Sequence, residues 1–534
     1  WHFVVVYYLD LDTPRPDLAE LYRRLGFTRD ANRPEAVEKR RKTGMRMARE
    51  NIEELFDPGT FMEFGALTVA GQRRRRDLDD LMRNTPADGL IAGYGAVNGR
   101  YFDEEAARCV GLAYDYTVLA GTQGGFNHRK TDRMLEVAQD WKVPVVWFAE
   151  GGGGRPGDTE GPGTGGGGAL SVPTFATYAE LSGLVPRIGI AAGRCFAGNA
   201  VMFGLSDITI ATKNSSIGMG GPAMIEGGGL GVYHPDEVGP IAVQTKNGVV
   251  DITVDDEAEA TRVAKQALSY FQGPIKEWSC GDQRKLRHAV PENRLRVFDV
   301  REIISLIADE GWCTELRPDW GAGMITALIR IEGRPFGVIA NNCKFLSGAI
   351  DADGADKAAR MMALCDAFDL PIVSLCDTPG YIVGPEAEKA GAVRHGVRMY
   401  AVGSNVDVPV FTVVLRKAYG LGAMAMAQGR FDKPVFAISW PTGEFGGMGL
   451  EGAARLGNRR ELEAIADPDE RKKRLDQIIA ASYERGKALI QAQWLQVDAV
   501  IDPADTRAWI MRGLKSMPAA PRRERKKRPW VDTW

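Results

Sequence analysis

Histidine and paired cysteine are scarce in this sequence. It has five His and seven Cys among 534 residues, no C-x-x-C pair, and no H-E-x-x-H, G-x-S-x-G or G-x-x-x-x-G-K-[ST] motif. These absences argue against a zinc ribbon, a metalloprotease helix, a serine-hydrolase elbow and a P-loop nucleotide site. We therefore expect no metal in this chain, and any ATP-dependent chemistry must belong to another chain or domain.

Long apolar runs and a strong net charge are also missing. The net charge is −3, and no apolar run approaches the ~20 residues that cross a bilayer. Neither nucleic acid nor a membrane is an expected partner. The opening WHFVVVYYL lacks a basic n-region and ends at Asp10, so a signal peptide is not expected. The sequence has no initiating Met, so we expect a chain that begins partway into a longer polypeptide. Unpatterned cysteines favour a reducing compartment, the cytoplasm or a mitochondrial matrix.

Glycine, by contrast, is abundant and clustered, with 63 residues. Two stretches share one order of features: an apolar strand, a glycine turn, a helix start built from small residues, a second strand and a second glycine turn. They are residues 188–221 (IGIAAGRCFAGNAVMFGLSDITIATKNSSIGMGG) and 410–449 (VFTVVLRKAYGLGAMAMAQGRFDKPVFAISWPTGEFGGMG). A helix start leaves backbone N–H groups free. Such groups can stabilise an oxyanion without a titratable side chain.

Short apolar strands alternate with helical segments along the chain, which predicts an α/β fold. The second half repeats the order of the first. Pro144 and Pro371 correspond at an offset of 227, Pro186 and Pro409 at 223, and Gly198 and Gly422 at 224. We interpret this as two copies of one domain, and therefore two backbone oxyanion sites. The polar segment 281–296 is the predicted boundary.

Other candidates each have a structural and a functional interpretation. The glycine-rich stretch 151–168 is either a disordered loop or a flexible wall that brings Gly152, Gly153 and Gly154 near a ligand and turns Arg155 toward a phosphate or carboxylate. The basic run 73–76 is either a solvated loop or a landing site for a nucleotide phosphate. Glu150 and Asp377, at strand ends, either act as acid or base or cap their loops.

The combination of motifs resembles a known family. The segments that carry the likeness are MARENIEELFDPGTFMEFG, PADGLIAGYGAVNGR, the glycine-rich loop with Arg155, AGRCFAGN, DVREII, and RKAYGLGAMAM followed by WPTGEFGGMG. Together they resemble the carboxyltransferase component of biotin-dependent acyl-CoA carboxylases, of the propionyl-CoA and methylcrotonyl-CoA type. The resemblance covers roughly residues 37–520.

The resemblance implies two tandem crotonase-like domains, each a ββα superhelix. We expect an acyl-CoA-side domain (37–290) and a biotin-side domain (291–520). Outside the resemblance lie an N-terminal extension (1–36) and a basic tail (521–534), which its composition predicts to be disordered. The resemblance also implies partner domains or subunits that carry biotin carboxylase and the biotin carrier. A homo-oligomer, commonly a hexamer, would form the site between the N-domain of one protomer and the C-domain of another.

The resemblance also assigns roles to residues. Ala197 and Gly198 would hold the thioester oxygen of an acyl-CoA, and Leu421 and Gly422 would polarise the ureido oxygen of biotin. The remaining substrate contacts would come from the glycines and side chains around these turns: Gly152, Gly153, Gly154, Arg155, Gly220, Gly221, Ala423 and Met424. Met424 has two interpretations, core residue or lining of the acyl pocket.

This sequence departs from the family pattern at Met424, where propionyl-type members have Asp, so a short acyl substrate is not assumed. The segment GMGGPAMIEGGGLG looks most like the carboxyltransferase portion of large single-chain carboxylases. Two alternatives to a carboxylase remain. One is the decarboxylase subunit of a sodium pump, which runs the same half-reaction backwards, and the other is a non-enzymatic scaffold.

Overall fold

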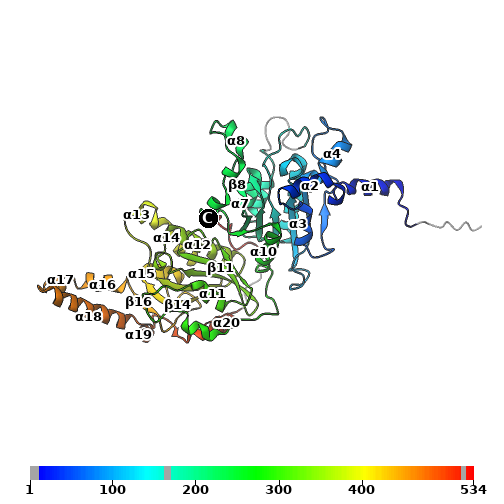
Figure 1. The fold of residues 1–534 in the computed structure, drawn as a ribbon. Coiled ribbons are helices and arrows are strands. Elements are labelled where there is room, and N and C mark those ends of the chain that lie inside the picture. The colour runs from blue at the N-terminus through cyan, green and yellow to red at the C-terminus, as the bar shows by residue number, and fades with distance from the viewer. Residues whose placement is uncertain (1–10, 162–169, 519–524) are drawn as a thin grey trace, which may run out of the picture.

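Two β-sheets, one in each half of the chain, organise the structure (Figure 1). The computed structural model describes residues 11–161, 170–518 and 525–534. The first sheet has the strand order β1-β2-β3-β4-β5-β7-β9 and the second β10-β11-β12-β13-β14-β15-β17. In each sheet the first three strands are antiparallel and the later ones parallel. Strands alternate with helices in both halves, as expected of an α/β fold.

The strands of the first half are β1 (Met62–Phe64), β2 (Leu90–Ala96), β3 (Arg108–Tyr114), β4 (Val145–Phe148), β5 (Arg187–Ala191), β6 (Arg194–Phe196), β7 (Ile208–Thr212), β8 (Ser216–Gly218) and β9 (Ile252–Val254). Its main helices are α1 (Pro16–Gly26), α2 (Pro34–Lys42), α3 (Ala48–Leu55), α4 (Leu78–Asn84), α5 (Gly125–Trp141), α6 (Thr174–Glu180), α7 (Gly198–Gly204), α8 (Pro222–Gly227), α9 (Ile241–Gln244) and α10 (Glu257–Ser269).

The strands of the second half are β10 (Cys313–Leu316), β11 (Met324–Ile331), β12 (Arg334–Asn341), β13 (Ile372–Thr378), β14 (Val410–Tyr419), β15 (Phe436–Ser439), β16 (Glu444–Gly446) and β17 (Ala499–Val500). The helices are α11 (Val300–Ile307), α12 (Ala352–Ala367), α13 (Pro385–Lys389), α14 (Ala392–Gly403), α15 (Gly420–Met426), α16 (Leu450–Gly457), α17 (Arg459–Glu463), α18 (Pro468–Gly486), α19 (Ala488–Gln493) and α20 (Thr506–Ser516).

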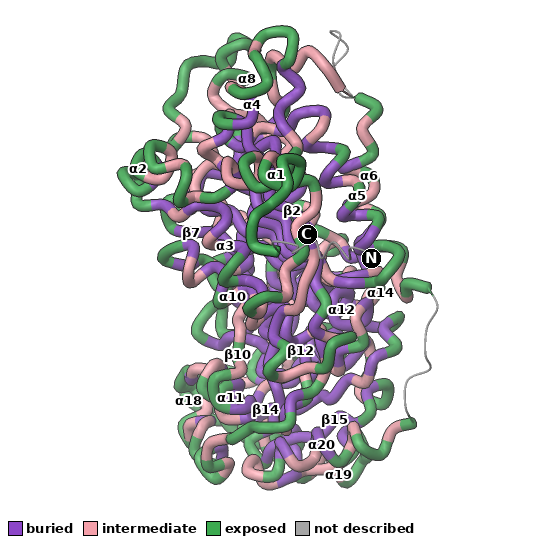
Figure 2. Tube along the Cα trace, turned by 90° about the vertical axis from the view of Figure 1, so that its right-hand side faces the viewer, coloured by how far each residue is buried: buried purple, intermediate pink, exposed green. Residues whose placement is uncertain are grey.

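Alternate residues of each central strand enter different cores, because side chains of a strand point to opposite faces. In β3, Val110 and Leu112 join the core under α5, whereas Cys109 and Ala113 join the core under α3 and α10. The same core under α3 and α10 continues into the second half beneath α12. Figure 2 shows buried residues running through the middle of both halves. The two sheets are thus packed into one body.

The internal repeat is confirmed by strand register. Val110 pairs with Val145 in the first sheet, and Gly337 pairs with Ile372 in the second, an offset of 227 for both strands. The loops that follow repeat as well: Gln123 N donates to the Gly153 carbonyl at 2.7 Å, and Ile350 N to the Gly380 carbonyl at 3.0 Å. The domain boundary expected at residue 290 falls between the two sheets, and its exact position stays a prediction.

The basic tail is ordered where the structure describes it, contrary to the expectation of disorder. In residues 525–534, the backbone N–H of Val531 donates to Ser182 Oγ at 2.9 Å, and the Val531 side chain is buried. Arg528 pairs with Asp366 of α12 at 2.7 Å. The tail therefore forms a strap across both halves, and the C-terminus lies between them in Figure 1. Composition predicted disorder because it shows basic side chains but not the buried carboxylates that receive them.

Part of the glycine-rich stretch, residues 162–168, lies outside the described residues. In the portions of the chain that are described, no helix is both long and apolar enough to cross a membrane.

Candidate active site

The first candidate turn begins at Ala197, between β6 and α7. Ala197 has φ 52° and ψ −122°, a conformation that costs a non-glycine residue on the order of 1–3 kcal/mol. Its own N–H donates to the Gly218 carbonyl at 3.0 Å. The next N–H, that of Gly198, has no acceptor among the described residues. Ala197 therefore contributes its strained backbone to the turn, and Gly198 contributes the free donor.

The glycine-rich loop packs directly against this turn. A Cβ at Gly153 would lie 2.6 Å from the Ala197 Cβ, so only glycine fits there. Asn199, fully buried, accepts a hydrogen bond from the Gly153 N–H at 2.9 Å and donates to the Gly121 carbonyl at 3.3 Å. The structure thus brings Gly153 and the Ala197 turn together. Asn199 was missed in the sequence because a single Asn in a helix start has no periodic signal.

Gln123 and Phe175 close the other side of the turn. A Cβ at Gly198 would lie 2.0 Å from Gln123 Oε1 and 3.1 Å from the Phe175 ring. Gln123 is itself held by its Nε2, which donates to the Tyr114 hydroxyl at 3.0 Å. Any side chain at position 198 would therefore displace this support.

The Arg155 side chain points into the protein interior. Its side chain is 1% exposed, its guanidinium forms an ion pair with Asp88, and it donates to the Thr122 carbonyl at 2.8 Å. Burial raises the pKa of Asp88, which the nearby Arg155 charge opposes. Because the positive charge is matched inside the protein, Arg155 is placed to hold the loop rather than to contact a ligand anion.

The basic run 73–76 lies beside the same loop. Arg75 donates to the Gly157 carbonyl at 3.2 Å, and the Arg73 N–H donates to a Glu160 carboxylate oxygen at 2.9 Å. Within the described residues neither Arg74 nor Arg75 forms an ion pair with a carboxylate. These two exposed cations stay available to an anion at the rim of the loop.

Gly220 and Gly221 follow β8, the strand that pairs with β6 next to the first turn. A Cβ at Gly221 would contact the ring of Phe196, the residue before Ala197, at 3.3 Å. The short strands β6 and β8 pair in parallel here. From Gly221 onward α8 and its loop project from the body (Figure 1) and expose Met224, Leu230 and Val232.

The second candidate turn lies between β14 and α15. Gly420 has φ +56°, and the following N–H groups of Leu421 and Gly422 have no acceptor within the described part of the chain. A Cβ at Gly422 would lie 2.7 Å from the Gly380 backbone, so α15 starts in close contact with the loop after β13. The Tyr400 hydroxyl donates to the Leu421 carbonyl at 2.7 Å.

The strand register carries the repeat into both turns. Arg187 and Val410 occupy equivalent positions, as do Arg194 and Lys417, at an offset of 223. Continued along the chain, this offset superposes Ala197 on Gly420, and both have positive φ. Gly198 then corresponds to Leu421, one residue earlier than its sequence pairing with Gly422. Two equivalent turns thus present free N–H groups in the two halves.

The flanking residues of the second turn divide between core and surface. Ala423 is buried, whereas Met424 is 36% exposed and Leu421 is 64% exposed. Met424 is therefore not a pure core residue, and its side chain reaches the surface one turn away from the free N–H groups.

The strand-end carboxylates are bound internally. Glu150 is bound by both terminal nitrogens of Arg40, at 2.9 and 2.5 Å, and Asp377 by Arg416 at 2.8 Å. Burial raises the pKa of Glu150 to about 7, against the lowering effect of Arg40. Both carboxylates lie in the protein interior, as expected of residues that cap their loops.

The described residues hold no cluster typical of a metal site, and most of their cysteines are buried. Across them, no group of three or more His, Cys, Asp or Glu side chains is arranged to hold a metal ion. Burial raises the pKa of Cys109, Cys195, Cys365 and Cys376, which disfavours their thiolates. The exposed donors at both turns are backbone N–H groups.

Comparison with known proteins decides the family. The carboxyl transferase domain model matches residues 39–530. The chain belongs to the carboxyl transferase domain family. It is 34% identical over 489 residues to the methylmalonyl-CoA carboxyltransferase 12S subunit of Propionibacterium freudenreichii subsp. shermanii, covering 90% of each chain. The expected resemblance is thereby confirmed.

Solved structures agree with this family. A single-chain, multi-domain long-chain acyl-CoA carboxylase has a TM-score of 0.88 and 55% identity, and the match covers 94% of this chain and 49% of that one. This carboxyl transferase chain therefore spans about half the length of that carboxylase. The transcarboxylase 12S hexamer, with methylmalonyl-CoA bound, has a TM-score of 0.81 and 30% identity, with 98% and 99% covered.

Proposed function

We propose that the chain is the carboxyltransferase component of a biotin-dependent acyl-CoA carboxylase, which transfers a carboxyl group from carboxybiotin to the α-carbon of an acyl-CoA. The observation that carries this proposal is the pair of repeat-related turns with free N–H groups at Gly198 and at Leu421 and Gly422. Two carbonyl-type oxygens gain negative charge in such a transfer, and each turn serves one of them. Family membership supports this assignment.

The first turn suits the thioester of the acyl-CoA. When its carbonyl oxygen accepts the Gly198 N–H, removal of the α-proton places negative charge next to a donor that is already oriented. Asn199 and Gln123 hold this donor in place by fixing Gly153 and the face of Gly198. Each oxyanion donor of this kind is worth about 3 kcal/mol of transition-state stabilisation.

The second turn suits the ureido group of biotin. Its donor set fits, because a neutral carbonyl oxygen needs N–H donors and no counter-charge, and Leu421 and Gly422 supply two. Carboxybiotin, when bound, supplies the carboxyl group and a ring nitrogen that accepts the α-proton. The chain itself then needs no catalytic His or Cys. Its part is to orient both oxygens and to stabilise the charge that develops on them.

The glycine-rich loop and the neighbouring basic run 73–76 suit the coenzyme A moiety. Gly152 to Gly154 allow close backbone approach, and Arg74 and Arg75 are exposed cations beside them that can meet a phosphate. Arg155 acts indirectly in this proposal, since its pair with Asp88 braces the loop.

The two turns lie in different halves of the molecule, with α7 and α15 well apart in Figure 1. We therefore extend the proposal to a homo-oligomer in which the first turn of one copy faces the second turn of another. The hexamer of the transcarboxylase 12S structure supports such an assembly. Biotin carboxylase and biotin carrier functions would come from partner domains or subunits, as the length of the single-chain carboxylase suggests.

The proposal also includes the length of the acyl group. Met424 and the exposed Met224 and Leu230 offer apolar surface rather than a carboxylate near the turns. Together with 55% identity to a long-chain acyl-CoA carboxylase, this favours long acyl chains over propionyl.

The test is a transfer assay. The purified chain is incubated with a biotin carrier domain carrying labelled carboxybiotin and a panel of acyl-CoAs from acetyl to palmitoyl. We expect label in the acyl-CoA, most rapidly with long chains. No label in any thioester would refute the carboxyltransferase proposal. Reaction only in reverse, from a carboxylated acyl-CoA to free biotin, would identify a decarboxylase subunit instead.

A further inference from the structure

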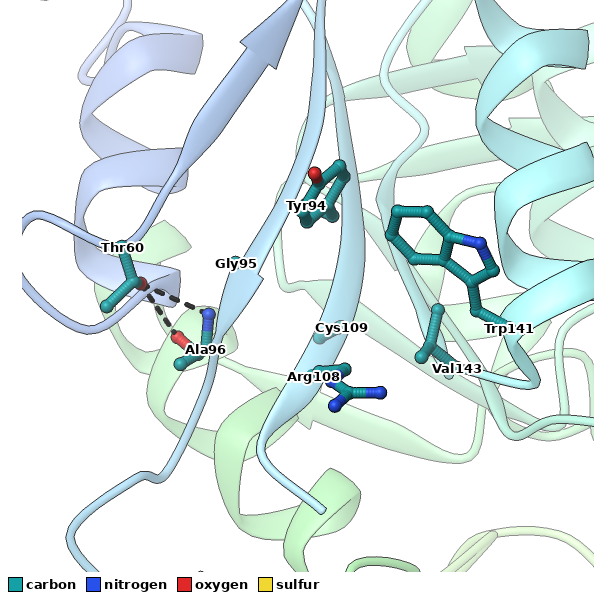
Figure 3. A pocket seen from close by; sticks show the side chains of 8 residues that line it. All are labelled: Thr60, Tyr94, Gly95, Ala96, Arg108, Cys109, Trp141 and Val143. Carbon is teal, nitrogen blue, oxygen red and sulfur yellow. Dashed lines mark hydrogen bonds between the residues drawn. The ribbon is translucent and has the colours of Figure 1, made fainter. Parts of the chain in front are cut away.

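A cavity of about 520 Å³ opens on the first sheet where β2 and β3 extend past the end of α5 (Figure 3). Its walls are the side chains of Tyr94, Trp141, Val143 and Arg108, with Ala96 beneath them. A volume of this size is in the range of small-molecule sites. The edge-to-face contact of Tyr94 and Trp141, at 5.0 Å between centroids, fixes one wall.

The strand register explains why these side chains share a face. Ala96 pairs with Arg108 and Tyr94 with Val110, so the positions at 94, 96 and 108 lie on one side of the hairpin. Gly95 faces the other side, where a Cβ would lie 2.8 Å from the Phe56 ring. α5 ends at Trp141 and leaves this part of the sheet uncovered.

The cavity is separate from the candidate active site. The glycine loop and the Ala197 turn follow the carboxyl ends of β4 and β5, whereas the cavity lies at the amino end of β3. Seven residues of β3 at ~3.3 Å each separate the two edges of the sheet by about 20 Å. The cavity lining and the two turns have no residue in common.

Its chemistry is apolar with one unmatched positive charge. Arg108 is exposed at the rim, and its guanidinium has neither a hydrogen bond nor an ion pair with any described residue. Trp141, 48% exposed, presents a large apolar surface to the cavity. In Figure 3 the Arg108 side chain extends on the same side as Val143 and Trp141.

We propose that this cavity is a second ligand site that binds an amphipathic carboxylate, an aliphatic chain ending in one carboxyl group. The chain would lie over Tyr94, Ala96 and Val143 beneath Trp141. The carboxylate would accept hydrogen bonds from the Arg108 guanidinium, a pairing whose planar geometry matches both groups. Burial of each methylene adds to affinity, so binding strengthens with chain length until the cavity is full.

The experiment uses the whole chain and equilibrium dialysis with radiolabelled decanoate. A saturating acyl-CoA is present in a parallel series so that binding at the active site is separated from binding at the cavity. The variants are Arg108→Gln and Trp141→Ala. The matched controls are Arg133→Gln, an exposed arginine on α5, and Trp494→Ala, an exposed tryptophan in the second half.

We expect one saturable site per chain that acyl-CoA does not displace. Arg108→Gln should weaken decanoate binding at least about tenfold, since charged hydrogen bonds are worth more than that, and should abolish the preference for decanoate over decanol. Trp141→Ala should weaken decanoate and decanol alike, and both controls should bind normally. Absence of saturable binding, full displacement by acyl-CoA, or equal loss in the controls would each overturn the proposal. The transfer assay does not depend on this cavity. A negative transfer assay would therefore refute the proposed function but leave the proposal of a second ligand site standing.

Discussion

A proline at position 421 isolates the contribution of one backbone N–H. Leu421 lies in the first turn of α15, its N–H has no acceptor in the described chain, and its side chain is 64% exposed. Proline lacks the N–H and is tolerated in the first turn of a helix. Leu421→Pro therefore removes a donor without opening a cavity, whereas proline at Gly198 or Gly422 would collide with Gln123 or with the Gly380 backbone.

The magnitude follows from the number of donors. Two free N–H groups serve the second turn, and removing one should lower transfer by about 10²- to 10³-fold, equivalent to roughly 2.7–4 kcal/mol. The matched control is Leu421→Ala, which keeps the N–H while losing the same exposed side chain. KM for acyl-CoA should stay unchanged in both, because the first turn at Gly198 is intact.

The assay is steady-state transfer from a labelled carrier, with Tm measured in parallel. The proposed role of the Leu421 N–H is refuted if the transfer rate of Leu421→Pro is within threefold of the rate of Leu421→Ala. It also fails if the proline variant loses acyl-CoA affinity in place of turnover. A fall in Tm of more than a few degrees would mean that α15 has unfolded. In that case the test uses a semisynthetic chain in which N-methyl-leucine replaces Leu421, because the N-methyl group removes the same backbone N–H proton. The affinity of this chain for the biotin carrier is then compared with that of the unmodified chain.

Three further predictions test the supports of the site and fold. Asn199→Leu should leave the Gly153 N–H without its acceptor, at a cost of about 1–3 kcal/mol in chemical denaturation, and should raise KM for acyl-CoA; an unchanged KM would mean that the loop does not need this bond. Burial lowers the pKa of Lys357 to about 7, so the unfolded state binds more protons between pH 7 and 10. The contribution of Lys357 to the free energy of unfolding should therefore rise with pH over this range. The chemical denaturation midpoint of the unchanged chain should rise from pH 7 to pH 10, and that of Lys357→Met should rise less. Val531→Ala should cost about 2 kcal/mol by loosening the strap across both halves, whereas the exposed Val383→Ala should be neutral; equal thermal shifts would contradict an ordered strap.

Much of the fold could be predicted because its signals are local. Apolar strands such as β4 and β5 are short continuous runs bounded by Pro and Gly, and their repetition at offsets near 225 predicted two copies of one domain. The strand register confirms this. The turns after β6 and β14 were also visible, because helix starts built from small residues follow directly on glycine turns.

What could not be predicted depends on contacts between distant segments. Asn199, Gln123 and Asp88 carry no pattern of their own. Only the fold shows that Asn199 and Gln123 bond to the glycine loop and that Asp88 pairs with Arg155. Gly198 was paired with Gly422 because both are glycines that follow an apolar strand. The strand register keeps an offset of 223 through the turn and pairs Gly198 with Leu421 instead.

The sequence by itself therefore determined the α/β class, the internal repeat, the family and the two turns, since each is encoded in contiguous residues. Only the tertiary structure decided which N–H groups are free, that Arg155 is neutralised inside the protein, and that the basic tail crosses both halves. The physical reason is that hydrogen-bond satisfaction and charge pairing depend on which distant groups meet. The sequence does not distinguish the free backbone N–H of Leu421 from that of Ala197. Only the fold brings the Gly218 carbonyl to the Ala197 N–H as its acceptor.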